Sequence, residues 1–213
     1  MFILRCQYST LMSSLHSVID VSNFFVDYFK RSVDPMTLPR VQAFVYFTQA
    51  ECLCRLGRPM FAEEIRAYPT GPAVSKLGFY YEDAGNGPIE VHREFNPRVF
   101  TPEEYDLLMD VALYLNTFST SQLQIMAFAT GSPWQVFYTS REITTIPNES
   151  IREYYQQLPR VPSYKDQIMD AVSASLMTPM EYGAEYETSE PTIVYTENEV
   201  AEAWESSSSQ DRS

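Results

Sequence analysis

The side chains that most often do chemistry in proteins are scarce in this chain. It has two histidines, His16 and His92, and neither stands in a recognisable zinc motif. Catalysis requires a group of suitable pKa held beside a partner, and no serine has the order of a catalytic triad around it. The acidic pairs 63–64 and 103–104 fit a solvated face and a helix start better than an acid/base couple. The residues therefore predict a protein that is not an enzyme and that uses no metal and no cofactor.

The three cysteines, Cys6, Cys52 and Cys54, are odd in number and do not form a disulfide framework, which suits a reducing compartment. Cys52 and Cys54 lie two apart on a predicted helix, so their side chains leave opposite faces and make a poor metal pair. No apolar run approaches the ~20 residues that span a bilayer, and we expect no signal peptide. The sequence predicts a cytoplasmic protein with no membrane partner.

Charge is distributed unevenly along the chain, whose formal net charge is -13. Residues 181–213 hold nine acidic residues and one basic residue, so the rest of the chain is only mildly acidic. No stripe of Lys and Arg is present, which disfavours direct nucleic-acid binding. The aromatic content of 14% is high and suits both a core and a protein interface. The charge and composition are compatible with protein partners that are basic or hydrophobic.

Hydrophobic periodicity predicts a mainly α fold, a compact multi-helix domain. The predicted helices are 17–30, 38–56, 73–82, 101–115, 119–131, 148–157 and 164–175. The helix 38–56 is apolar almost all round and should be central, with Gly57 as its left-handed C-terminal stop. We expect a short helix or turn at 60–68, an irregular loop at 69–72, and a minor β-hairpin or edge strand at 89–93.

The domain organisation follows from composition. Residues 1–16 form an N-terminal lead-in, 17–178 the helical domain, and 179–213 a flexible acidic tail rich in Ser and Glu. Two apolar islands interrupt the tail, 192–195 with Tyr195 and 200–204 with Trp204. They are either docking segments or a chance scatter of apolar residues.

One long stretch carries an ordered set of motifs. An aromatic helix runs from Pro39 to Ala50, the turn Gly57-Arg58-Pro59-Met60-Phe61 follows, and Ala67-Tyr68-Pro69-Thr70-Gly71-Pro72-Ala73-Val74 comes next. Pro133-Trp134 lies about sixty residues further on. This order resembles the Panacea domain, the family of SocA-like and phage-associated GepA-like proteins, over residues 19–137. The family pattern is a Leu-Gln-Lys-Leu-Leu-Tyr-Tyr-type helix, a Gly-x-Pro-Leu-Phe turn, an Ala-Trp-x-x-Gly-Pro-Val loop and a late Pro-Trp.

The departures from that pattern remove charged and titratable groups. Gln-Lys of the family helix is Gln42-Ala43 here, Ala-Trp is Ala67-Tyr68, and a Tyr before Gly-Pro is Thr70. The family's late histidine falls near Ala127-Phe128 and is lost. A function based on Lys or His chemistry therefore does not carry over, whereas one based on shape and aromatic area does.

The resemblance implies an antitoxin that neutralises a cognate toxin protein by direct binding. The candidate partner-binding residues are Gln42, Tyr46, Phe61, Tyr68, Gly71, Pro72, Trp134, Tyr195 and Trp204. As an alternative to binding, those in the domain serve packing, with Pro133-Trp134 wedged against the Gly71-Pro72 loop. Two other functions stay open: an adaptor that delivers a partner to a protease, and a phage-encoded inhibitor of host defence. The acidic tail is a further candidate for binding, in a basic groove of the toxin in place of nucleic acid.

Overall fold

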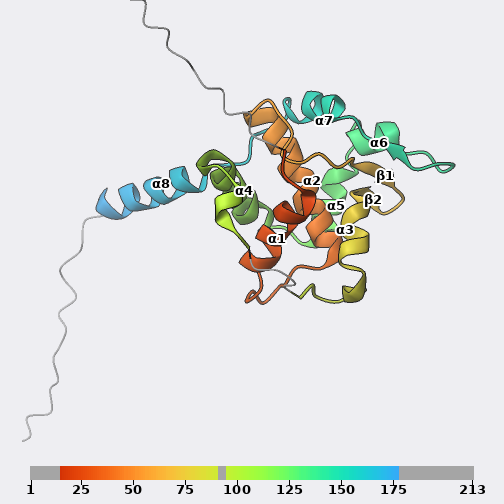
Figure 1. Cartoon of the computed structure of the whole chain (residues 1–213). Coiled ribbons are helices and arrows are strands. Elements are labelled where there is room, and N and C mark those ends of the chain that lie inside the picture. Colours follow the sequence, from red (N-terminus) through yellow and green to blue (C-terminus); the bar gives the residue numbers. More distant parts are fainter. Residues whose placement is uncertain (1–14, 91–94, 178–213) are drawn as a thin grey trace, which may run out of the picture. The chain divides into compact units, whose positions relative to one another are not determined.

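The computed structural model describes residues 15–90 and 95–177, and the side chains of the last helix as far as Ser173. The chain divides into two compact units, and the first ends at Ser173. As the periodicity predicts, the fold is mainly α, with a small three-stranded sheet (Figure 1). The α-helices in the described part are α1 (Val18–Tyr28), α2 (Leu38–Arg55), α3 (Ser75–Tyr80), α4 (Pro102–Leu115), α5 (Thr120–Ala127), α6 (Pro133–Phe137), α7 (Asn148–Tyr155) and α8 (Tyr164–Met177).

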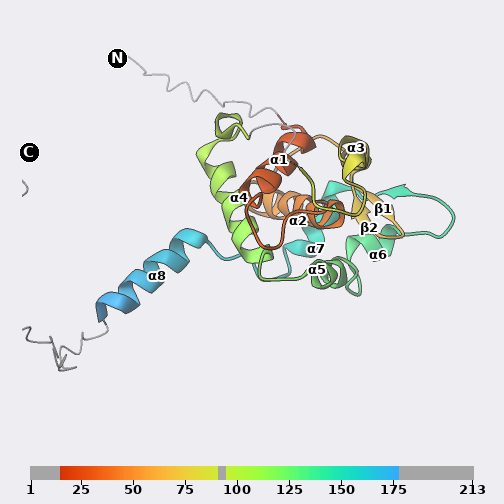
Figure 2. The ribbon, with the colours of Figure 1, turned by 90° about the horizontal axis from the view of Figure 1, so that it is seen from below.

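Helix α2 is the centre of the domain, as its all-round apolar sequence predicts. It packs against α1, α4, α5 and α7, and Figures 1 and 2 show it surrounded by them. Its inward face is buried along its length, from Val41 to Cys52, and so are Tyr46 and Phe47. Pro39 occupies the first turn, where a missing N–H costs nothing, and Gly57 follows the helix with φ +67°. The core therefore grows around this helix.

Side-chain caps fix where the surrounding helices begin. Thr101 accepts a hydrogen bond from the Glu104 N–H, and the Glu104 carboxylate accepts one from the Thr101 N–H, which together form a capping box. Ser119 and Gln122 form a second capping box at α5. Helix α5 ends at Ala127, before the predicted stop near Gly131.

The sheet is not where the sequence predicts it. Strands β1 (Arg66–Tyr68) and β2 (Gly71–Ala73) form an antiparallel hairpin, and β3 (Thr144–Thr145) pairs with the other edge of β1. The expected helix or turn at 60–68 and the irregular loop at 69–72 are therefore corrected. Residues 69–70 are instead the two-residue connection of a hairpin, since Tyr68 pairs directly with Gly71. Gly71 has a φ of +126°, a backbone conformation that favours glycine.

The strand expected at 89–93 is not formed in its described part. Ile89 is buried, and its N–H donates to the Met36 carbonyl at 2.8 Å. The only pairing there is an isolated bridge between Thr37 and Pro88, and proline has no N–H to extend a ladder. Residues 91–94, with His92, lie outside the described residues.

The C-terminal elements divide between the described and undescribed parts of the chain. Helix α8 forms as predicted, and its apolar face is largely exposed: Ile168 is 55% and Val172 46% accessible. The tail at 179–213, with Tyr195 and Trp204, lies outside the described residues.

Candidate protein-interaction groove

A groove of about 570 Å³ opens beside the N-terminal half of α2. Its walls come from the β1–β2 hairpin, from α3 and from α5, and Figures 1 and 2 show these elements on one side of α2. Gln42, Tyr68, Gly71 and Pro72 all line it, so four residues that the sequence singled out meet at one place. The volume is in the range of ligand-binding clefts, and most of the lining side chains are apolar.

The polar groups of the groove floor are bonded within the protein. The Gln42 amide donates to the Val74 carbonyl at 3.0 Å and accepts from the Val74 N–H at 2.8 Å. The Tyr68 hydroxyl lies 2.7 Å from Ser75 Oγ. Because these groups are already paired, the floor offers contact area rather than a cluster of free donors and acceptors.

Trp134 supports the groove from behind. Its indole Nε1–H donates to the Tyr68 carbonyl at 2.8 Å, and its ring packs between Phe128 (centroids 4.2 Å apart) and Tyr138 (4.7 Å). Phe128 lies so close to Gly71 that an added Cβ would stand 3.1 Å from its ring. These contacts agree with the packing alternative for Trp134, which holds the hairpin in place.

The rim of the groove carries residues that the sequence analysis did not single out. Phe79 of α3 lines it and is 75% exposed. Gly78 also lines it, and a Cβ added there would meet nothing within 4 Å. Glu82 is the only charged residue in the lining among the described residues. The run Phe79-Tyr80-Tyr81, at and just after the end of α3, is a usable signal in the sequence, since three consecutive rings in and after a helical turn point in different directions and cannot all be buried on one face.

Two other sequence candidates lie away from the groove. Tyr46 and Phe61 are each 1% exposed and belong to the core. Burial raises the pKa of the Tyr46 hydroxyl, and the Tyr46 ring packs edge-on against Tyr155 with centroids 5.8 Å apart. The Phe61 backbone is held by the amide of Gln49 on α2. In this structure neither side chain is accessible to a partner; each stabilises the elements from which the groove is built.

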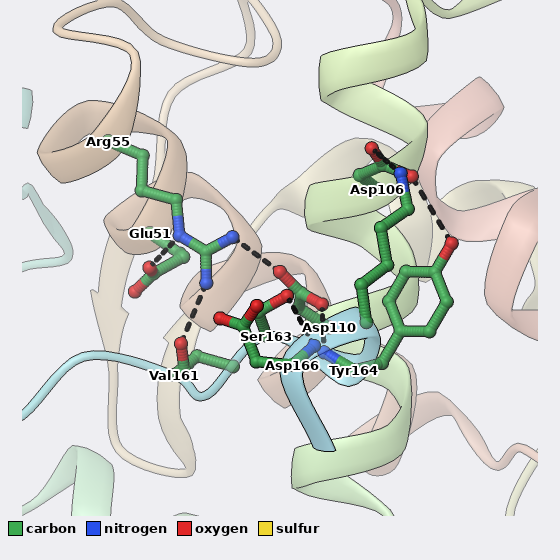
Figure 3. Close-up of polar contacts among 9 residues, drawn as sticks. Glu51, Arg55, Asp106, Asp110, Val161, Ser163, Tyr164 and Asp166 are labelled. Carbon is green, nitrogen blue, oxygen red and sulfur yellow. Dashed lines mark hydrogen bonds and ion pairs between the residues drawn. The ribbon is translucent and has the colours of Figure 1, made fainter. Parts of the chain in front are cut away.

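A polar cluster joins α2, α4 and the start of α8 (Figure 3). The Arg55 guanidinium donates to Glu51 at 2.6 Å, to Asp110 at 2.5 Å and to the Val161 carbonyl at 2.7 Å. Asp110 also accepts the Tyr164 N–H at 2.7 Å. Burial lowers the pKa of Arg55, but the Asp110 and Glu51 carboxylates outweigh burial and raise it. The cluster ties the start of α8 to the domain, a structural role.

A buried carboxylate joins the N-terminal segment to α4. The Glu104 side chain has no exposed surface; Arg58 Nη2 lies 2.8 Å from one oxygen and His16 Nε2 3.0 Å from the other. Burial raises the pKa of Glu104, but the Thr101 N–H, Arg58 and His16 outweigh it and lower that pKa to about 2. His16 also packs on the Phe100 ring, and its backbone N–H donates to the Met60 carbonyl at 3.0 Å, so the arrangement is part of the core that anchors the N-terminal segment.

The two cysteine thiols in the described part of the chain are not activated. Burial raises the pKa of the Cys52 thiol to about 12 and also raises that of Cys54, so neither is an activated nucleophile. Among the described residues, no three His, Cys, Asp or Glu side chains are grouped closely enough to hold a metal ion. Within the same residues, no helix combines the length and apolarity needed to cross a membrane.

Comparisons with known proteins add no relative: no family model, no curated protein and no solved structure matches this chain. The resemblance to the Panacea domain therefore rests on the sequence motifs alone.

Proposed function

We propose that the chain is an antitoxin that neutralises a cognate toxin protein by binding it at the groove. The observation that carries the proposal is the groove itself, an apolar cleft whose polar floor is internally bonded and whose rim exposes Phe79. Exposed aromatic area around an apolar cleft is typical of protein-binding surfaces. The order of motifs that resembles the Panacea domain supports the toxin as the partner, and we expect the encounter in the cytoplasm.

The test is co-expression. Each open reading frame that neighbours the gene would be induced alone and together with this chain, and growth would be scored. We expect one neighbour to stop growth, and this chain to restore growth and co-purify with that neighbour's product. Failure to restore growth against any toxic neighbour contradicts the proposal.

The half-life of the toxic partner separates occlusion from delivery to a protease. An occluding antitoxin leaves the partner's half-life unchanged or longer, whereas an adaptor shortens it. The measurement is a translation-arrest chase with and without this chain.

A further inference from the structure

We propose that the groove receives an amphipathic helix of the toxin, with apolar side chains between α3, α5 and the hairpin and a Lys or Arg beside Glu82. This inference rests on the proposed function and adds the conformation and the charge of the bound segment.

The walls of the groove call for apolar side chains. Leu123 and Ala127 of α5, Phe128 after it, and Gly78 and Phe79 of α3 all line the groove. An amphipathic helix presents side chains three and four positions apart on one face, which is the arrangement that fills such a groove. A bound helix would also cover Phe79, which is 75% exposed.

The hairpin edge disfavours a bound strand. In the sheet order β2-β1-β3, β2 is an edge strand beside the groove, where a partner strand would add if its backbone were available. Pro72, at the centre of β2, has no N–H to donate. The next residue but one, Val74, has its N–H and its carbonyl taken by the Gln42 amide. A strand bound to β2 would therefore lack backbone hydrogen-bond partners. A helix satisfies its own backbone groups and can bind through side-chain contacts alone.

Charge selects a cationic segment. Glu82 lines the groove, Asp83 follows it, and both are exposed. Two cations on the same side of the described domain are paired with other carboxylates: Lys76 Nζ lies 2.7 Å from Glu63, and Arg66 Nη2 lies 3.0 Å from Glu64. A Lys or Arg of the partner beside Glu82 would gain a favourable charge interaction with these two carboxylates.

The test uses random peptides of about 16 residues, some four helical turns, displayed on phage and selected on the full chain. Gly78→Trp fills the groove from a position where the new side chain has space, and Gly78→Ala is its matched control. We expect the selection to enrich peptides with apolar residues three and four apart and at least one Lys or Arg. Enrichment of alternating strand-like peptides, of acidic peptides, or of none that depends on the groove would overturn the inference.

Affinities of the enriched peptides, measured by fluorescence anisotropy, give the second readout. We expect Gly78→Trp to weaken binding at least tenfold and Gly78→Ala to leave it within twofold, with circular dichroism confirming that both variants fold. Glu82→Gln should weaken binding severalfold at low salt and less at high salt, whereas Asp83→Asn should have a smaller effect. Equal affinity for Gly78→Trp and wild type would overturn the inference.

The helix-binding groove and the antitoxin function can be refuted separately. Restoration of growth by the Gly78→Trp variant refutes the groove and leaves the antitoxin function standing. Peptide binding in the groove without any restoration of growth by the wild-type chain refutes the antitoxin function and leaves the peptide specificity.

Discussion

Replacing Glu104 by Gln should destabilise the domain in a pH-dependent way. The amide keeps the shape of the carboxyl and its acceptor for the Thr101 N–H, but removes the negative charge that faces Arg58 and His16. The pKa of Glu104 is about 2 in the folded state, against an ordinary value of 4.5. Since one pKa unit corresponds to 1.36 kcal/mol, the charged form contributes about 3 kcal/mol at neutral pH.

The sign of the pH dependence follows from the lowered pKa. A carboxyl with a depressed folded-state pKa contributes its full stabilisation above the unfolded-state pKa, near 4.5, and loses it as the pH falls toward 2. We therefore expect the variant to be about 2–3 kcal/mol less stable than wild type at pH 7, and the gap to shrink between pH 4.5 and 2.

Urea denaturation from pH 7 to pH 3, followed by circular dichroism, measures this gap. Glu103→Gln is the matched control, because Glu103 is an exposed carboxylate in the same first turn of α4 and shares any effect of the helix dipole. The control should change stability by less than about 0.5 kcal/mol at every pH. A gap for Glu104→Gln that is absent at pH 7, or that stays constant down to pH 3, would refute the reasoning.

Three further substitutions probe the supports of the groove and of α8. Trp134→Phe removes the N–H donor to the Tyr68 carbonyl and should cost about 1–2 kcal/mol; an unchanged melting temperature would contradict this. Gly71→Ala places a Cβ 3.1 Å from the Phe128 ring at φ +126° and should cost about 1–3 kcal/mol in urea denaturation; wild-type stability would show that the hairpin relaxes freely. Arg55→Met leaves two buried carboxylates without their cation and should cost about 2–4 kcal/mol, whereas an unchanged denaturation midpoint would show that the cluster contributes little.

Local sequence signals were sufficient to predict where the main helices begin and end. The apolar arc of α2, the proline in its first turn and Gly57 after it placed the helix within one residue of its observed end. The capping boxes at Thr101 and Ser119 began α4 and α5 where they were expected. Each of these signals acts over a few residues and needs no distant partner, which is why it can be read from the chain.

The sheet and the groove depend on distant contacts. Strands of two or three residues are too short to show alternation, and β3 at Thr144–Thr145 pairs with β1 from far along the chain. The motifs indicated Gln42 and the Gly71-Pro72 loop, but not that α5 would complete the groove. The run Phe79-Tyr80-Tyr81 indicates that one ring is exposed, but which ring lines the groove, and that Glu82 joins it there, depends on tertiary packing.

The measurement that tests the central claim most directly is growth rescue by the matched pair at Gly78. Gly78→Trp and Gly78→Ala would be co-expressed at equal levels with the neighbouring toxin that the wild-type chain neutralises. We predict that the Ala variant restores growth like the wild type and that the Trp variant, although folded, does not. Equal rescue by both variants would contradict neutralisation through the groove.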